Sequence, residues 1–231
     1  MDGKGDFAQY LSLLGIDFYP STEPKTERTH RTEIHVAEPS VEFHEARVTL
    51  AQLEREAAGC QRCSLASERS HIVFGSGDAQ AKLMFIGEGP GAQEDQQGQP
   101  FVGKAGQLLN AIIQAMGLER NKVYITNIVK CRPPENRDPK PGEMEACSLY
   151  LHQQIELIKP TVIVALGRVA AQFLLKSGEP LARLRHTIHQ LNDHSKLVVT
   201  YHPAYLLRSP DQKRKSWDDL KQVITLLGNR S

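Results

Sequence analysis

From Lys82 onward, short β-branched or apolar runs alternate with longer stretches of helical period. The alternation predicts four strands: Lys82 to Ile86, Val123 to Val129, Thr161 to Leu166 and Leu197 to Thr200. It also predicts four helices: Ala105 to Met116, Gly142 to Ile158, Arg168 to Lys176 and Gln212 to Leu227. Repeated strand-helix units of this length are typical of an α/β domain with a central, mostly parallel sheet covered by helices.

The N-terminal part of the chain follows a different pattern. Phe7 to Tyr19 is a short apolar segment, and residues 20–42 are rich in Pro, Glu, Thr and Ser without a helical or strand period, as in a disordered linker. Glu45 to Ala58 then places Val48, Leu50, Leu53 and Ala57 on one helical face, which we expect to pack on the following domain. We therefore expect a tail over residues 1–44 and a catalytic domain over 45–231.

Composition and charge refine this organisation. A length of 231 residues suits one globular domain, and no apolar run approaches the roughly 18 residues of a membrane span. No signal or transit peptide is recognisable at the N-terminus, so we expect a cytoplasmic protein without a membrane partner. The net charge of +1 divides into −5 before Cys60 and +6 from Cys60 onward, with +4 between Arg120 and Lys140. A nucleic-acid ligand is therefore compatible with the second part.

Four cysteines form a candidate metal site: Cys60, Cys63, Cys131 and Cys147. Structural disulfides are not expected in a cytoplasmic protein, and the first pair precedes the first strand rather than following one as in a thioredoxin-like redox motif. Four thiolates hold either a tetrahedral zinc ion or an iron–sulfur cluster, and spacing does not decide between them. Four unrelated thiols are the simplest alternative.

Other distinctive residues follow the ends of the predicted strands, where open parallel sheets bind ligands. The stretch GEGPG, Gly87 to Gly91, follows the first strand, and Phe101 lies in a glycine-bordered loop after it. Asn127 lies near the end of the second strand, and His202 begins HPAYLL after the last one. Each feature alone is common in ordinary turns, cores and helix caps, but together and in this order they are specific.

These motifs, together with the cysteine spacing, resemble family 4 uracil-DNA glycosylases over about Cys60 to Leu227. The resemblance implies a three-layer α/β/α fold around a four-stranded, mostly parallel sheet, and a 4Fe-4S cluster on the four cysteines. It also implies hydrolysis of the N-glycosidic bond of uracil in DNA, the first step of base excision repair. A related subgroup that forms a covalent uracil adduct has Gln in the glycine motif and an inserted basic loop. Here Gly89 and the uninterrupted GKAGQ favour the hydrolytic type.

For the reaction, we expect Phe101 to stack on an extruded uracil, Asn127 to read its polar edge and His202 to donate to its O2. Glu88 is the only carboxylate in the glycine loop and is a candidate catalytic residue, but the general base stays open between it, Glu94 and Asp95. The glycine loop completes the substrate pocket through three residues: Gly87, Glu88 and Gly89.

For DNA binding, Leu206 is the candidate wedge that fills the place of the extruded base. Arg132, Arg137 and Arg208 are candidate phosphate contacts. An iron–sulfur redox module and a DNA-damage-binding protein without catalysis are the alternative functions.

The N-terminal segment resembles the short Gln-Leu peptides by which bacterial repair proteins dock on the sliding clamp, through Gln9, Leu11, Leu13 and Leu14. A helix that folds back on the domain is the alternative. We expect the protein to be a monomer.

Overall fold

The computed structural model describes residues 48–228 of the chain. The expectations for residues 1–44, including the linker and the clamp-docking segment, lie outside these residues. None of the helices found between residues 48 and 228 is long and apolar enough to cross a membrane.

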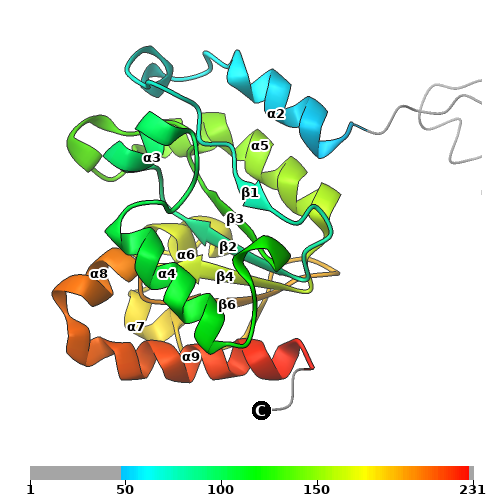
Figure 1. The fold of residues 1–231 in the computed structure, drawn as a ribbon, viewed down its shortest axis with the longest axis vertical. Coiled ribbons are helices and arrows are strands. Elements are labelled where there is room, and N and C mark those ends of the chain that lie inside the picture. The colour runs from blue at the N-terminus through cyan, green and yellow to red at the C-terminus, as the bar shows by residue number, and fades with distance from the viewer. Residues whose placement is uncertain (1–47, 229–231) are drawn as a thin grey trace, which may run out of the picture. The chain divides into compact units, whose positions relative to one another are not determined.

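A six-stranded sheet forms the centre of the domain, in the order β1-β3-β2-β4-β6-β5 (Figure 1). Its strands are β1 (Ser76–Gly77), β2 (Leu83–Gly87), β3 (Tyr124–Asn127), β4 (Val162–Leu166), β5 (His189–Gln190) and β6 (Lys196–Thr200). The four inner strands are parallel, and β1 and β5 are antiparallel at the two edges. The predicted parallel strands are confirmed. The prediction of only four strands is wrong because each edge strand has two residues, too few to show an alternating pattern.

The helices include the four predicted ones, each with bounds within one residue of the prediction at either end. In chain order they are α2 (Leu50–Ala58), α3 (Ala92–Gln97), α4 (Lys104–Ala115), α5 (Pro141–Ile158), α6 (Arg168–Leu175), α7 (Leu181–Leu184), α8 (Pro203–Arg208) and α9 (Lys213–Leu226). The short helices α3, α7 and α8 were not predicted. They span four to six residues, which is less than two turns of periodic pattern.

Helix α2 begins later than the sequence pattern suggested. Thr49 and Gln52 form a capping box, in which the Thr49 N–H donates to Gln52 Oε1 at 2.7 Å and the Gln52 N–H donates to Thr49 Oγ1 at 3.2 Å. Leu53 and Ala57 are buried, as expected, but Val48 precedes the cap and is exposed. The apolar face of this helix therefore starts inside the helix rather than at Val48.

Successive residues of the inner strands point to opposite faces of the sheet, and each face has its own hydrophobic core. Met84 and Ile86 of β2 lie in the core that α2, α5, α6 and α7 cover, whereas Leu83 and Phe85 lie in the core that α4 and α9 cover. Figure 1 shows α2 and α5 on one side of the strands and α9 on the other. The predicted three-layer α/β/α arrangement is confirmed.

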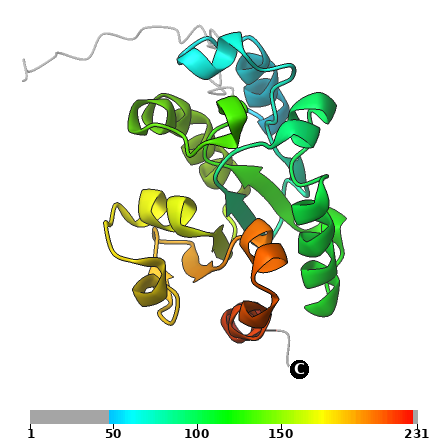
Figure 2. The ribbon, with the colours of Figure 1, turned by 90° about the vertical axis from the view of Figure 1, so that its left-hand side faces the viewer.

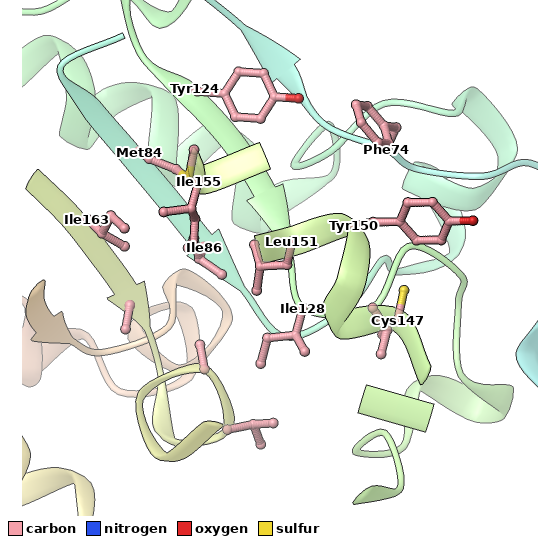
Figure 3. Close-up of a cluster of buried hydrophobic side chains, with 14 of the residues drawn as sticks. Phe74, Met84, Ile86, Tyr124, Ile128, Cys147, Tyr150, Leu151, Ile155 and Ile163 are labelled. Atoms are coloured by element: carbon pink, nitrogen blue, oxygen red, sulfur yellow. The ribbon is translucent and has the colours of Figure 1, made fainter. Parts of the chain in front are cut away.

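The core beneath α5 continues to a cysteine. Figure 3 shows Leu151 and Ile155 of α5 over Ile86, with Tyr150 and Cys147 of the same helix at one end of the cluster. Cys147 is buried there. One end of this core therefore contains a candidate metal ligand.

Candidate functional site

A cavity of about 470 Å³, here called the strand-end cavity, opens beyond the carboxyl ends of β2, β3 and β6. The strand order reverses beside β2, since the chain passes from β2 to β3 on one side and then to β4 on the other. Parallel sheets bind ligands at such a point. Figure 2 turns toward the reader the side of the molecule on which α8, in orange, lies. Six predicted site residues line the cavity: Glu88, Gly89, Phe101, Asn127, His202 and Arg208.

The glycines of the loop after β2 are needed for close packing. A Cβ atom at Gly87 would collide with the Asn127 side chain and lie 2.7 Å from Phe101 Cζ, and one at Gly89 would lie 2.8 Å from Val129 Cγ2. Such distances are too short for real carbon atoms. Gly87 lies directly beneath the cavity residues Asn127 and Phe101 rather than on the lining itself.

Phe101 has a left-handed backbone, with φ of 53°, which is uncommon outside glycine and costs free energy. The loop is held on both sides of it. Arg120 donates to the Pro100 carbonyl at 2.6 Å, and the Glu94 carboxylate accepts from the Val102 and Gly103 N–H groups at 2.9 Å each. The Phe101 ring is therefore fixed in place, with its centroid 5.7 Å from that of the His202 ring.

Asn127 is the last residue of β3, and its side chain is 1% exposed. Its Oδ1 is buried and has no hydrogen-bond partner within residues 48–228. A buried polar atom without a partner costs about 1–3 kcal/mol. Because Asn127 lines the strand-end cavity, a ligand N–H in the cavity would satisfy this atom.

His202 caps α8, and its Nδ1 accepts from the Ala204 N–H at 3.1 Å. Burial lowers the pKa of His202 to about 4, and the positive charge of Arg208 lowers it further. The ring is therefore neutral near pH 7, and because Nδ1 is an acceptor, its proton is on Nε2. Nε2 is thus a neutral N–H donor at the cavity.

Glu88 is a partly buried carboxyl group on the same cavity. Burial raises its pKa to about 7, and the carboxylate of Asp138 raises it further, whereas Arg168 opposes this shift. Arg168 is itself paired with Asp138 at 2.6 Å. Sequence reasoning missed Asp138 and Arg168, because neither lies in a recognisable motif.

The two other candidate bases have structural partners. Asp95 is buried and accepts from the Ser70 N–H at 3.0 and 3.1 Å, and it does not line the cavity. Its candidacy as a general base is therefore wrong. Glu94 does line the cavity, but its carboxylate holds the Phe101 loop.

The predicted DNA contacts divide into accessible and buried residues. Arg208 lines the cavity and is exposed, and Arg137 also lines it but is paired with Glu143 at 2.7 Å. Arg132 lies outside the lining and donates to Asn136 Oδ1 at 2.9 Å. Leu206 as the wedge is wrong: it is 1% exposed because α8 turns it, with Pro203, toward the core.

The four cysteines, although far apart in the sequence, line one pocket, here called the cysteine pocket, with Arg69, Lys130 and Tyr150 among its walls. Arg69 Nη1 donates to Cys131 Sγ at 3.1 Å, and the Lys130 N–H donates to Cys147 Sγ at 3.3 Å. Burial raises the pKa of Cys131, and that of Cys147 to about 11.

The donor set of the cysteine pocket is entirely sulfur, which suits zinc or an iron–sulfur cluster rather than a hard cation. Within residues 48–228, no three His, Cys, Asp or Glu side chains are grouped closely enough to hold a single metal ion. A cluster of four irons spreads its ligands wider than one ion does. The pocket therefore fits the larger group better.

Lys130 lies between the two sites, and sequence reasoning missed it. Its side chain is 0% exposed, and Nζ donates to Thr126 Oγ1, the Asn127 carbonyl and Gln154 Oε1 at 2.6–2.7 Å. The same residue lines the cysteine pocket. A buried lysine with three neutral acceptors thus connects the end of β3 to the cysteines.

Comparisons with known proteins agree with this geometry. A family model described as "Uracil DNA glycosylase superfamily" matches residues 74–221. A type-4 uracil-DNA glycosylase of Archaeoglobus fulgidus is 40% identical over 79% of this chain and 95% of that protein. Type-4 enzymes of Saccharolobus solfataricus and Thermotoga maritima are 43% and 44% identical over 76% and 73% of the chain, covering 85% and 89% of their own lengths.

Proposed function

The chain belongs to the uracil-DNA glycosylase superfamily and is a DNA-repair enzyme that removes uracil, and we propose that the strand-end cavity binds the extruded base and cleaves its N-glycosidic bond. The cavity volume of about 470 Å³ is ample for one pyrimidine. Gly89 and the uninterrupted GKAGQ support hydrolysis to an abasic site rather than a covalent adduct.

The observation that carries the proposal is the partnerless, buried Oδ1 of Asn127. Uracil has an N3–H donor beside an O4 acceptor, and one amide can accept from the first and donate to the second. Cytosine has a bare N3 and an amino group at these positions, so it would leave both partners unsatisfied. Buried groups left unpaired in this way reject the wrong ligand strongly. Asn127 is therefore the residue that selects uracil.

Phe101 supplies the face on which the uracil ring stacks. Because its backbone is held by Glu94 and Arg120, the ring is ordered before the base arrives. Pre-ordering reduces the entropy lost on binding.

His202 stabilises the leaving group. When the C1′–N1 bond breaks, its electron pair stays on uracil, and the negative charge is shared with O2. A neutral Nε2–H aimed at O2 stabilises this charge as it develops, with help from the backbone N–H groups of Glu88 and Gly89. Because its pKa of about 4 keeps the ring neutral, His202 does so without donating a full proton.

Glu88 is the proposed general base. A water oxygen attacks C1′ as the bond to N1 breaks, and the proton of that water passes to the Glu88 carboxylate. With a pKa of about 7, a substantial fraction of this group is ionised at neutral pH, and it is basic enough to take a proton. Asp138 and Arg168 set this balance from opposite directions.

Arg208 is the principal phosphate contact among the predicted ones, because it is exposed at the rim of the cavity. Arg137 and Arg132 would contact phosphate from the adjacent loop, where they now hold Glu143 and Asn136. These three side chains position the DNA without reading its sequence.

The four cysteines would hold a 4Fe-4S cluster: Cys60, Cys63, Cys131 and Cys147. When bound, such a cluster crosslinks segments that are distant in the chain, and its iron–sulfur core supplies structural rather than acid-base chemistry here. Cys131 and Cys147 flank the loop with Arg132 and Arg137, so ligation would fix that loop beside the cavity. Iron and acid-labile sulfide in the purified protein would test this assignment, and zinc without sulfide would contradict it.

An excision assay tests the function. Matched duplexes with U·G, U·A, T·A and C·G pairs are incubated with protein and treated with alkali, which cleaves abasic sites. We expect breaks at uracil alone. A DNA-binding protein without catalysis would retain the duplex without breaking it, and a redox module would do neither.

Three expectations from the sequence stay predictions: the monomeric state, the cytoplasmic location and docking of residues 1–20 on the sliding clamp. Deleting residues 1–20 should abolish affinity for the clamp and leave excision unchanged. Unchanged clamp affinity would disprove the docking.

A further inference from the structure

Tyr205 has no role in the chemistry above, yet its ring lies at the strand-end cavity. It is on α8, three residues after His202, and lines the cavity. Its side chain is 37% exposed, unlike that of Leu206, which is buried. An accessible aromatic ring is thus present where the sequence predicted an accessible leucine.

Tyr205 is one layer of a stack of three side chains. Its ring stacks on Tyr201, with centroids 5.1 Å apart and an interplanar angle of 30°. The Arg185 guanidinium lies 4.0 Å from the centroid of the Tyr201 ring. Cation–π attraction and ring stacking therefore follow one another from Arg185 outward to Tyr205.

The inner end of this stack is anchored in the core. Arg185 Nε and Nη2 donate to the two oxygens of Asp219 at 2.8 and 3.1 Å, and both side chains are buried. Arg185 also donates to the Lys215 carbonyl, and Asp219 accepts from Thr200 Oγ1 at 2.8 Å. Bidentate arginine-carboxylate pairs fix orientation as well as charge. The orientation of the Tyr205 ring is thus fixed from α9 and β6.

A pre-ordered, half-exposed ring beside a base pocket fits a nucleobase better than it fits a phosphate or a protein side chain. Every base has a flat π face, so stacking on an aromatic ring is tolerant of sequence. When uracil leaves the strand, the neighbouring base loses a stacking partner, and that lost contact is part of the cost of extrusion. A ring beside the pocket can replace it.

We propose that Tyr205 stacks on the base adjacent to the extruded uracil and so stabilises the extruded state. This inference rests on the proposed function, because it presupposes an extruded uracil in the strand-end cavity. It assigns to Tyr205 the contact with the DNA stack that the sequence assigned to Leu206.

The test uses the full chain and three variants: Tyr205→Ala, Tyr205→Phe and Leu207→Ala. Leu207 is the matched control, because it is the next residue of the same helix, is 43% exposed and does not line the cavity. The substrate is a U·G duplex with 2-aminopurine next to a 2′-fluorinated, uncleavable deoxyuridine. The fluorescence of 2-aminopurine is quenched when it stacks and rises when it does not.

At saturating protein, we expect the Tyr205→Ala complex to be several-fold brighter than the wild-type complex, and Tyr205→Phe and Leu207→Ala to match the wild type. On the cleavable duplex, Tyr205→Ala should bind about tenfold more weakly, with thermal stability unchanged. Equal brightness of the Tyr205→Ala and wild-type complexes would overturn the proposal. So would equal loss in Tyr205→Ala and Tyr205→Phe, since that would indicate a hydroxyl hydrogen bond. Failure of the wild type to excise uracil would instead disprove the proposed function.

Discussion

Polar atoms in the strand-end cavity face open space, whereas those in the cysteine pocket bond to one another. Asn127 Oδ1 has no partner within residues 48–228, and Phe101 has a strained backbone held by its neighbours. In the cysteine pocket, Cys131 and Cys147 each accept a hydrogen bond from nitrogen. The difference indicates that the first site is prepared for a transient ligand and the second for a permanent one.

Lys130 makes the two sites neighbours rather than independent. Its Nζ holds the Asn127 carbonyl, and its backbone N–H holds Cys147 Sγ. Removing a cysteine should therefore affect mainly stability, and removing a cavity residue mainly rate. The following variants test this division, from the largest expected effect to the smallest.

Cys147→Ala should remove a cluster ligand and lower the free energy of unfolding by about 4 kcal/mol, as expected when a structural metal group is lost. Iron content, sulfide content and denaturant unfolding measure it. Undiminished iron with unchanged stability would show that the cysteine pocket does not hold a cluster.

His202→Ala should lower the single-turnover excision rate by about 10²–10³-fold, the usual cost of one donor to a developing negative charge. Binding of uncleavable DNA should change little, because the donor acts mainly in the transition state. Iron content and unfolding should match the wild type. Equal losses of rate and binding would identify His202 as a structural cap of α8 instead.

Asn127→Leu keeps the volume of the side chain but removes both polar groups. We expect uracil excision to fall by about 10²-fold, since about 1–3 kcal/mol is associated with each buried hydrogen-bonding group. The ratio of uracil to cytosine excision should fall as well. A retained preference for uracil would show that another residue reads the base.

Asp138→Asn tests the charge balance at Glu88. Because the base acts when ionised, the rate should rise as pH increases through about 7, the pKa of Glu88. Asp138 raises that pKa, so its replacement should lower the pKa and move the rise in rate to lower pH. His202, with a pKa of about 4, stays neutral over this range. An unshifted pH profile would exclude Glu88 as the titrating base.

Arg208→Ala should give the smallest change. Loss of one phosphate contact should weaken binding about equally for all sequences and reduce the slope of log affinity against log salt by about one. The excision rate at saturating protein should stay near that of the wild type. A sequence-dependent loss would show that Arg208 contacts bases.

Much of the fold was predictable because the inner strands and long helices repeat a clear pattern over many residues. The edge strands β1 and β5 and the short helix α8 were not, because two to six residues carry too little pattern. The assignment of Leu206 as a wedge failed for the same reason: α8 is too short for its buried face to be recognised in the sequence.

The sequence by itself determined the family, the ligand edge of the sheet and the residue types there, because glycine, asparagine, histidine and cysteine at fixed spacing specify chemistry. Only the tertiary structure decided which polar atoms lack partners and which side chains are accessible. The partnerless Oδ1 of Asn127, the buried Lys130 and the stack from Arg185 to Tyr205 all depend on residues far apart in the chain. Burial and hydrogen bonding depend on every neighbour in space, and no local pattern records these neighbours.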